Sequence, residues 1–157
     1  MADNRGKFFH ATVTMPTLIT ACPCGGASYA ACCGPFIDGC ALAPDAATLM
    51  RSRYSAYVVR DAAYLRATWH ASTCPIDAIL SDDEDLHWLG LDVKSTLRIR
   101  QPTLQAADQE VDACVEFVAR YKIKGRAYRL HEVSRFVREN GRWWYLDGSF
   151  PARGKTR

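Results

Sequence analysis

Four of the seven cysteines in this chain of 157 residues lie within twelve positions, in the segment ACPCGGASYAACCG at residues 21–34. They are Cys22, Cys24, Cys32 and Cys33. An odd number of cysteines excludes complete disulfide pairing within the chain, and neither the adjacent pair nor the Cys-Pro-Cys triplet has good disulfide geometry. The segment contains few large apolar side chains, so it cannot fold around a hydrophobic core of its own.

The spacing of these four cysteines favours a metal site over a set of buried free thiols. Four thiolates complete the tetrahedral coordination of zinc, and Gly25 and Gly26 permit the tight turns that such a site requires. The alternative is that the thiols are ordinary core residues, because cysteine is a common small buried side chain. We predict one structural zinc ion held by the four thiolates. Cys40 is an alternative ligand, and Cys74 and Cys114 are expected in the core.

The segment LITAC at residues 18–22 resembles the cleavage box of bacterial lipoproteins, in which the cysteine receives the lipid. The preceding segment FFHATVTMPTLITA contains His10, Pro16 and four threonines, where a signal peptide needs an apolar run of about 7–15 residues. We therefore interpret residues 1–20 as a loose N-terminal tail. No run of about 18 apolar residues occurs, so we expect no membrane-spanning helix. Unpaired cysteines then predict a cytoplasmic protein.

Composition indicates one globular domain and argues against several functional classes. Apolar residues make up 48% of the chain and charged residues 24%, as in ordinary soluble proteins. The net charge of +3 is spread along the chain without a basic helix or an arginine–glycine tail, which argues against a dedicated nucleic-acid-binding protein. The sequence has no P-loop, no G-x-G-x-x-G and no G-x-S-x-G motif, so it gives no sign of nucleotide binding or serine hydrolysis.

The region after the cysteines predicts helices. Residues 44–60 have helical periodicity with Asp45 as the N-cap, and residues 61–69 form a second, short helix capped by Asp61. Residues 75–85 are expected to contain a third short helix that ends in the acidic turn SDDED. That turn lacks the alternating oxygen ligands and the glycine of a calcium-binding loop, so we interpret it as solvated.

Beyond residue 85 the hydrophobic pattern alternates, which predicts an antiparallel sheet. The tight turns Lys124-Gly125 and Asn140-Gly141 indicate hairpins. Helices followed by a meander of long antiparallel strands give an α+β fold. We expect four strands, at residues 86–99, 110–123, 126–139 and 142–148.

The first hairpin places a carboxylate on the inner face of the sheet. Counting back along both strands from the turn sets Phe117 opposite Glu132. A carboxylate on this apolar face must be paired or be held protonated, and Arg53, in the middle of the apolar side of the first helix, is the natural partner. We favour a structural ion pair over an acid–base group, because buried ion pairs are common without a catalytic role.

The aromatic residues on the two helices indicate either a packed core or a ligand pocket. Aromatic walls with few convergent polar groups are typical of ligand sites, whereas aromatics at helical spacing more often fill the core. His70 follows the second helix, where it is either a base or a group that interacts with the helix dipole. The six candidate pocket residues are Arg53, Tyr54, Tyr57, Trp69, His70 and Glu132.

Several segments carry a family resemblance. CPCGGASYAACCG resembles the SEC-C zinc motif, although its cysteine pairs are one residue closer together than is usual. The chain is also similar to the YchJ-like family of bacterial proteins in the segments LMRSRYSAY, YLRATWHAST, WLGLDV, VEFVARYKIKG and RLHEVSRFVRENGRWWYLDG. This resemblance implies a nuclear-transport-factor-2-like fold, in which helices close a curved sheet into a cone. It implies a bound metal but no particular reaction.

Two functional hypotheses follow from these observations. The chain would consist of the tail, a SEC-C-like zinc knuckle at residues 21–40 and a nuclear-transport-factor-2-like domain at residues 41–157. The first hypothesis is a cytoplasmic adaptor that docks a protein partner through the knuckle, which we favour because no catalytic constellation emerges. The second is a small-molecule enzyme or ligand-binding protein that uses the cone. Glu132 or His70 would then be the acid–base group of a dehydratase- or isomerase-like reaction.

Overall fold

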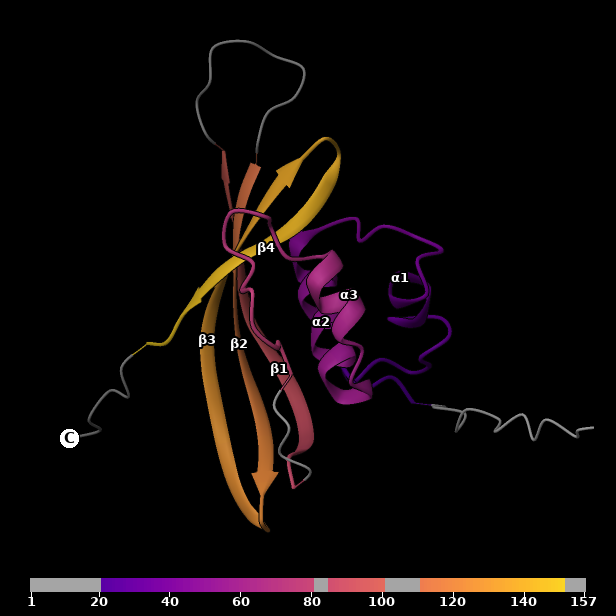
Figure 1. Ribbon diagram of the computed structural model, residues 1–157, viewed down its shortest axis with the longest axis vertical. Helices are drawn as coiled ribbons and strands as arrows, with labels where there is room; N and C mark the ends of the chain where they lie inside the picture. Colours follow the sequence, from indigo (N-terminus) through magenta and orange to yellow (C-terminus); the bar gives the residue numbers. More distant parts are fainter. Residues whose placement is uncertain (1–20, 81–84, 101–110, 152–157) are drawn as a thin grey trace, which may run out of the picture.

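The protein folds as a four-stranded antiparallel sheet with helix α2 (Ala46–Val59) against one face, and the short helix α3 (Ala62–Ala67) and the cysteine-rich segment pack against α2 (Figure 1). This computed structural model describes residues 21–80, 85–100 and 111–151. The α+β fold predicted from the sequence is confirmed. The predicted tail at residues 1–20 lies outside the described residues. None of the helices in the described ranges has the length and apolar character needed to cross a lipid bilayer.

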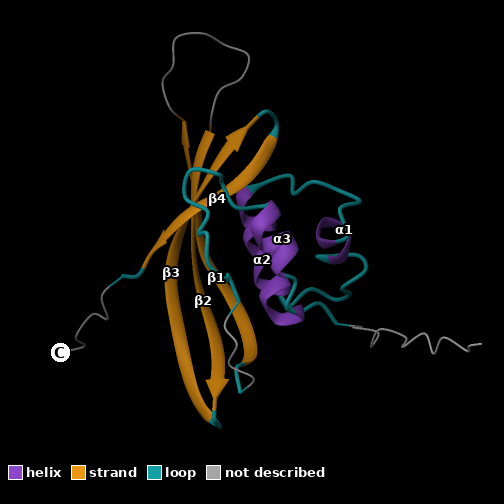
Figure 2. Cartoon of the chain, in the orientation of Figure 1, coloured by secondary structure: helices purple, strands orange, loops and turns teal. Residues whose placement is uncertain are grey.

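Helix α2, Ala46–Val59, is the central element of the structure (Figure 2). Its N-cap is Asp45, whose carboxylate accepts a hydrogen bond from the backbone N–H of Thr48 over 2.7 Å. The helix ends at Arg60, which adopts the left-handed conformation (φ 61°) that commonly terminates helices. Both ends of this helix are therefore set by local chain chemistry.

The short helix α3, Ala62–Ala67, follows α2 directly and packs beside it. Asp61 caps it by accepting a hydrogen bond from the backbone N–H of Tyr64 over 2.8 Å. The Tyr64 hydroxyl is in turn hydrogen-bonded to Ser52 Oγ at 2.7 Å, which ties α3 to α2. Both predicted N-caps are confirmed.

The prediction of a third helix is wrong over residues 75–80, which form no helix. The SDDED turn that was expected to end it falls mostly on residues 81–84, outside the described residues. Arg66 donates hydrogen bonds to the carbonyl oxygens of Pro75 and Asp77, over 2.7 and 2.9 Å. A side chain from α3 therefore binds the carbonyl groups that a helix would have used for itself.

The sheet is a meander whose strands pair in the order β1-β2-β3-β4. Both predicted hairpin turns are present, and Lys124-Gly125 and Asn140-Gly141 each have φ values of 49° and 77°, as type I′ turns require. The predicted register is also confirmed, since Phe117 pairs with Glu132. The strands are β1 His87–Arg100, β2 Val111–Ile123, β3 Arg126–Glu139 and β4 Arg142–Ser149.

Helix α2 is buried on two faces. One face meets the concave side of the sheet, where Tyr54 packs edge-on against Trp88 with 5.6 Å between ring centroids. The other face carries the small side chains of Ser52 and Ser55, both fully buried, and meets α3 and the cysteine-rich segment. Helix α1, Gly34–Ile37, belongs to this outer layer and contacts α2. The central helix thus separates the cysteines from the interior of the cone.

Candidate metal centre and cone cavity

The four predicted ligand cysteines come together in space. Their sulfur atoms all lie within 4.8 Å of one another. Cys24 Sγ is 3.5 Å from Cys22 Sγ and 3.5 Å from Cys32 Sγ. Cys32 Sγ is 3.9 Å from Cys33 Sγ. All seven cysteines are free rather than disulfide-bonded, so the arrangement is a cluster of thiols.

The cluster has the dimensions of a tetrahedral metal site. Zinc–sulfur bonds of about 2.3 Å in a tetrahedron separate the sulfur atoms by about 3.8 Å. The neighbouring sulfurs here are 3.5 to 3.9 Å apart. The four cysteines could therefore hold a metal ion with little movement. Cys40, the alternative ligand, is exposed and does not belong to the cluster.

The two glycines after Cys24 shape the loop around the sulfurs. Gly25 adopts a φ of 93°, a value that suits glycine, and its N–H donates to the carbonyl oxygen of Cys22 over 2.9 Å. Gly26 has no room for a side chain, because an added Cβ would lie 2.7 Å from Cys32 Sγ. The Gly25-Gly26 turn therefore brings the two halves of the cluster together.

The thiols change one another's acidity. A hydrogen bond from Cys33 outweighs burial and lowers the pKa of Cys24 to about 4. Burial and a hydrogen bond to Cys24 raise the pKa of Cys32 to about 11, and the hydrogen bond to Cys24 together with burial raises the pKa of Cys33. Of these three thiols, Cys24 therefore ionises most readily. A bound divalent cation would supply the positive charge that allows all four to ionise.

The cysteine cluster rests on helix α2. Cys22 Sγ lies 3.7 Å from Ser55 Oγ, and Arg51 donates from Nη1 to the carbonyl oxygen of Cys24 over 3.4 Å. The buried cysteines belong to the same hydrophobic cluster as core residues of α2 and of the sheet. The cysteine-rich segment is therefore packed into the core.

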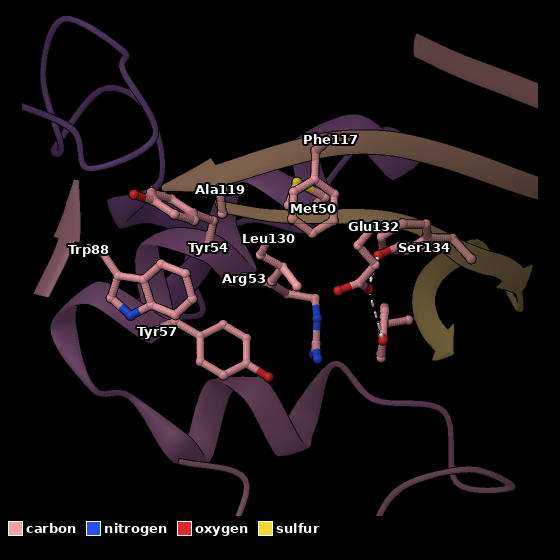
Figure 3. Close-up of a pocket in the computed structure, with 12 residues that line it drawn as sticks. Met50, Arg53, Tyr54, Tyr57, Trp88, Phe117, Ala119, Leu130, Glu132 and Ser134 are labelled. Atoms are coloured by element: carbon pink, nitrogen blue, oxygen red, sulfur yellow. Dashed lines mark hydrogen bonds between the residues drawn. The ribbon is translucent and has the colours of Figure 1, made fainter. Parts of the chain in front are cut away.

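A cavity of about 240 Å³ lies between α2 and the concave face of the sheet (Figure 3). Its volume is somewhat below the roughly 300 Å³ at which sites for drug-sized ligands begin, so it would suit a smaller molecule. Its walls are mostly apolar and aromatic. Four of the six predicted pocket residues line it, namely Arg53, Tyr54, Tyr57 and Glu132.

Arg53 is a buried cation at the wall of this cavity, with only 4% of its surface exposed. Its Nη1 donates to the carbonyl oxygen of Leu65 and to Thr68 Oγ1, each over 2.7 Å. The guanidinium carbon lies 5.1 Å from the Trp69 ring centroid and 4.4 Å from that of Tyr145. Burial lowers the pKa of Arg53, but a guanidinium in a protein stays charged. The guanidinium is thus held by hydrogen bonds from one of its edges and by contacts with two aromatic rings.

Glu132 is a buried carboxylate that reaches the same cavity from β3. Its Oε1 accepts hydrogen bonds from Ser134 Oγ over 2.6 Å and from the Tyr145 hydroxyl over 3.3 Å. Gly148 of β4 leaves the space that this carboxyl group occupies, since an added Cβ would lie 2.7 Å from Glu132 Cδ. The carboxylate therefore fits because Gly148 has no side chain, and two hydroxyl groups donate hydrogen bonds to it.

The expected ion pair between Arg53 and Glu132 is not present: among the described residues, no nitrogen–oxygen contact of 4.0 Å or less joins the two. Tyr145 contacts both of them, with its ring against the guanidinium and its hydroxyl on the carboxylate. Burial and the nearby carboxylate raise the pKa of Tyr145, so the phenol remains a hydrogen-bond donor. Arg53 takes its partners from α3 because that helix offers carbonyl and hydroxyl oxygens at its own end.

Comparison with known proteins assigns the chain to a family. The profile of the family described as YchJ, middle NTF2-like domain, matches residues 45–148. The chain belongs to this family. It is 52% identical over 143 residues to a UPF0225 protein of Ralstonia nicotianae, covering 85% of this chain and 93% of the relative. It is 56% identical over 133 residues to a UPF0225 protein of Cupriavidus metallidurans, covering 81% and 86%.

Two solved structures of SEC-C-motif-containing proteins are similar to this YchJ-family chain. One is a solution structure from Rhodopseudomonas palustris, with a TM-score of 0.66, 28% identity, and coverage of 83% of this chain and 98% of that one. The other is a crystal structure from Psychrobacter arcticus, also with a TM-score of 0.66 and 28% identity, covering 87% and 85%. The resemblance to the SEC-C and YchJ-like proteins is therefore confirmed.

Two of the predicted pocket residues lie elsewhere. Trp69 does not line the cavity. Its ring packs edge-to-face against that of Tyr145, with 4.8 Å between ring centroids. His70 lies with Nε2 3.2 Å from the Glu139 carboxylate and Nδ1 2.6 Å from Ser72 Oγ. The backbone N–H of His70 donates to the carbonyl oxygen of Tyr145 over 2.8 Å, which draws this segment alongside β4. This corrects the predicted pocket wall.

Tyr145 is the cavity residue that the sequence analysis missed. It pairs with Phe136 in the sheet, directly after a register shift between Arg135 and Phe136. A shift of this kind changes which side chains face the core, so simple alternation along β4 does not reveal the inward residue. The signal available in the sequence was the aromatic run of RWWYLDG next to a hairpin turn.

Proposed function

We propose that the protein is a zinc-stabilised binding protein, in which a structural zinc ion fixes helix α2 and the cone cavity takes a small molecule. The observation that supports this most directly is the position of α2 between the two sites. Cys22 lies against Ser55 on one face of the helix, while Arg53 and Tyr54 line the cavity from the other. Ordering the cysteine-rich segment would therefore order one wall of the cavity.

Zinc is the proposed metal because four thiolates in a tetrahedral arrangement suit its closed structural sites. Cys22, Cys24 and Cys33 are each 4% exposed or less, which leaves little access for a substrate at the metal. A structural role is the one that fits such burial. The thiolates also need a reducing compartment, so we propose the cytoplasm as the location.

Binding fits the cavity better than turnover does. The described residues that line it include no cysteine, histidine or lysine, and histidine is the side chain that most often serves as a general base near neutral pH. The groups that do line it are a permanent cation, a hydrogen-bonded carboxylate and phenols whose pKa values are raised by burial. These groups are suited to holding polar atoms of a ligand.

Native mass spectrometry of the full chain, purified without chelator, tests the metal part of the proposal. We expect one zinc ion per chain, released by chelation. A protein that carries no zinc, and whose seven thiols all titrate freely, would contradict it.

A fragment screen by NMR on the zinc-loaded protein tests the cavity part. Fragments that occupy the cavity should shift the signals of Trp88 and Tyr57, which line it. Ala119→Leu should abolish these shifts by filling the space, because Ala119 is fully buried in the cavity wall. Shifts that survive this change would place the fragments elsewhere.

A second candidate function is the docking of a protein partner beside the cysteine-rich segment. A groove of about 370 Å³ lies between this segment and α3, with Phe36 and Ile37 among its mostly apolar walls. Leu42 also lines the groove and is 61% exposed, so we propose that a partner inserts an apolar side chain here. A partner retained by the wild-type chain should be lost on Leu42→Asp. It should be kept on Leu97→Asp, which alters an equally exposed leucine of β1.

A further inference from the structure

The cone cavity contains two opposite charges in an otherwise uncharged wall. Arg53 and Glu132 are its only charged lining residues among those the structure describes. Both are buried, at 4% and 9% exposure. Figure 3 shows the two side chains projecting into the same space between α2 and the sheet. Because the charges cancel, the cavity as a whole attracts neither anions nor cations in preference.

Each of the two charged groups keeps one side without a partner. Arg53 donates from Nη1, but its Nε and Nη2 make no hydrogen bond within the described ranges. Glu132 likewise uses Oε1 and leaves Oε2 without a partner there. These unpartnered atoms of Arg53 and Glu132 are not fully buried. In the described part of the chain, the fully buried side-chain nitrogen or oxygen that lacks a hydrogen bond is the indole nitrogen of Trp69. The free edges of Arg53 and Glu132 therefore face the open volume.

A ligand that carries both signs of charge satisfies both edges with charge-assisted hydrogen bonds. A carboxylate gains a charge-assisted hydrogen bond from the guanidinium of Arg53. If the ligand has no positive group, its carboxylate is also repelled by Glu132 in the same small volume. An amine without a carboxylate is attracted by Glu132 but repelled by Arg53. A zwitterion places each of its charges against the opposite charge of the wall.

The rest of the wall is apolar and limits the size of the ligand. Met50, Phe117 and Leu130 line the cavity together with aromatic rings. A volume of about 240 Å³ leaves room for a few carbon atoms beyond the two charged groups. Apolar atoms of the ligand would gain by leaving water at this surface.

We infer that the cavity binds a small zwitterion of the amino-acid class, with its carboxylate on Arg53, its ammonium group on Glu132 and an apolar side chain against Met50, Phe117 and Leu130. This inference rests on the proposed binding function of the cavity and specifies its ligand. Tyr57 also lines the cavity, and its hydroxyl would be a further donor for the carboxylate.

Calorimetric titration of the zinc-loaded full chain tests the inference with matched probes. L-Leucine is compared with 4-methylpentanoate, which lacks the ammonium group, and with 3-methylbutylamine, which lacks the carboxylate. L-Phenylalanine is compared in the same way with 3-phenylpropanoate and 2-phenylethylamine. At least one of the two amino acids should bind about tenfold more tightly than both of its analogues. The inference is overturned if neither amino acid binds, or if each amino acid that binds is matched in affinity by one of its own analogues.

Variants locate the site and protect the test against misfolding. Glu132→Gln should weaken amino-acid binding about tenfold and bring it to the level of the deaminated analogue. Glu116→Gln is the matched control on the outer face of the same sheet, where Glu116 accepts a hydrogen bond from His131 over 2.7 Å, and it should leave binding unchanged. Ala119→Leu should abolish binding by filling the cavity, with a melting temperature recorded for every variant. Amino-acid binding that Ala119→Leu leaves unchanged would place the ligand outside the cavity and overturn the inference.

The two proposals can fail separately. If the analogues or unrelated fragments bind in an Ala119-dependent manner while the amino acids do not, the ligand class is wrong and the binding function stands. If none of the probes or fragments binds in the cavity, both are wrong.

Discussion

Cys22 Sγ lies 3.7 Å from Ser55 Oγ, so the cysteine cluster rests directly on the helix whose opposite face lines the cone cavity. Ser55 is fully buried, and its small side chain lets the sulfur approach the helix. The two sites therefore share one wall. Loss of the metal should disturb the α2 wall of the cavity, whereas small changes in the cavity should leave the metal bound.

Replacing Cys24 by serine should release the metal and loosen α2. Cys24 is 2% exposed and its sulfur contacts those of Cys22 and Cys32. We expect the variant to lose zinc and about 3 kcal/mol or more of unfolding free energy, because metal binding contributes directly to folding. Elemental analysis and chemical denaturation measure the two effects. Cys40→Ser is the matched control, and equal zinc content in Cys24→Ser and the wild type would contradict the assignment.

Gly26→Ala should weaken the metal site without removing a ligand. The added Cβ would lie 2.7 Å from Cys32 Sγ and 3.2 Å from Cys32 Cβ, so the loop must shift. We expect zinc to be released at a lower chelator concentration, with a loss of about 1–3 kcal/mol of stability from the forced repacking. Ala31→Ser, at an exposed position in the same segment, should behave as the wild type. An unchanged chelator titration of Gly26→Ala would show that the loop does not set the cluster geometry.

Arg53 and Glu132 should be only weakly coupled in stability. Arg53→Met removes hydrogen bonds to Leu65 and Thr68 and two aromatic contacts, so we expect a loss of about 2–4 kcal/mol. Glu132→Gln keeps an oxygen that can accept from the same hydroxyl groups and should cost about 1 kcal/mol.

A double-mutant cycle measures the coupling between these two residues. Because no direct ion pair joins them, we expect a coupling energy of about 1 kcal/mol. Breaking a directly paired, buried ion pair costs about 3–5 kcal/mol. A coupling energy in that higher range would show that the two groups are in contact in solution.

The ion pair between Asp147 and Arg135 should make the free energy of unfolding depend on pH. Arg135 Nε donates to Asp147 Oδ1 over 2.7 Å, and this hydrogen bond holds the pKa of Asp147 below its usual value. A lowered folded-state pKa contributes stability above the unfolded pKa, which is about 3.9 for aspartate, and this contribution is lost as the pH falls through the folded value.

Denaturation of Asp147→Asn at several pH values tests this sign. Both side chains are partly exposed, so we expect the variant to be less stable than the wild type by only about 0.5–1 kcal/mol at pH 7. The difference should shrink as the pH falls below about 4 and vanish once the pH lies below the lowered folded-state pKa of Asp147. Asp77→Asn, at an exposed position, is the control. A difference that grows as the pH falls would contradict the assignment.

The sequence by itself determined the parts of this protein that local chain chemistry controls. Asp45 and Asp61 cap helices because their carboxylates reach backbone N–H groups three residues ahead. The two-residue turn at Lys124-Gly125 fixes the register of its hairpin, and that register alone places Glu132 on the inner face of the sheet. The close spacing of the four cysteines likewise predicted that their sulfurs come together, before any long-range contact was known.

Only the tertiary structure decided what the buried polar groups touch. Arg53 could be seen from the sequence to face inward, but its choice of Leu65 and Thr68 depends on how α3 packs beside α2. Tyr145 reaches Glu132 through a register shift in β3 and β4, which strand alternation does not predict. The remaining cavity volume depends on how all side chains of both layers fit together. Such features are set by contacts between residues far apart in the chain, and no local periodicity records them.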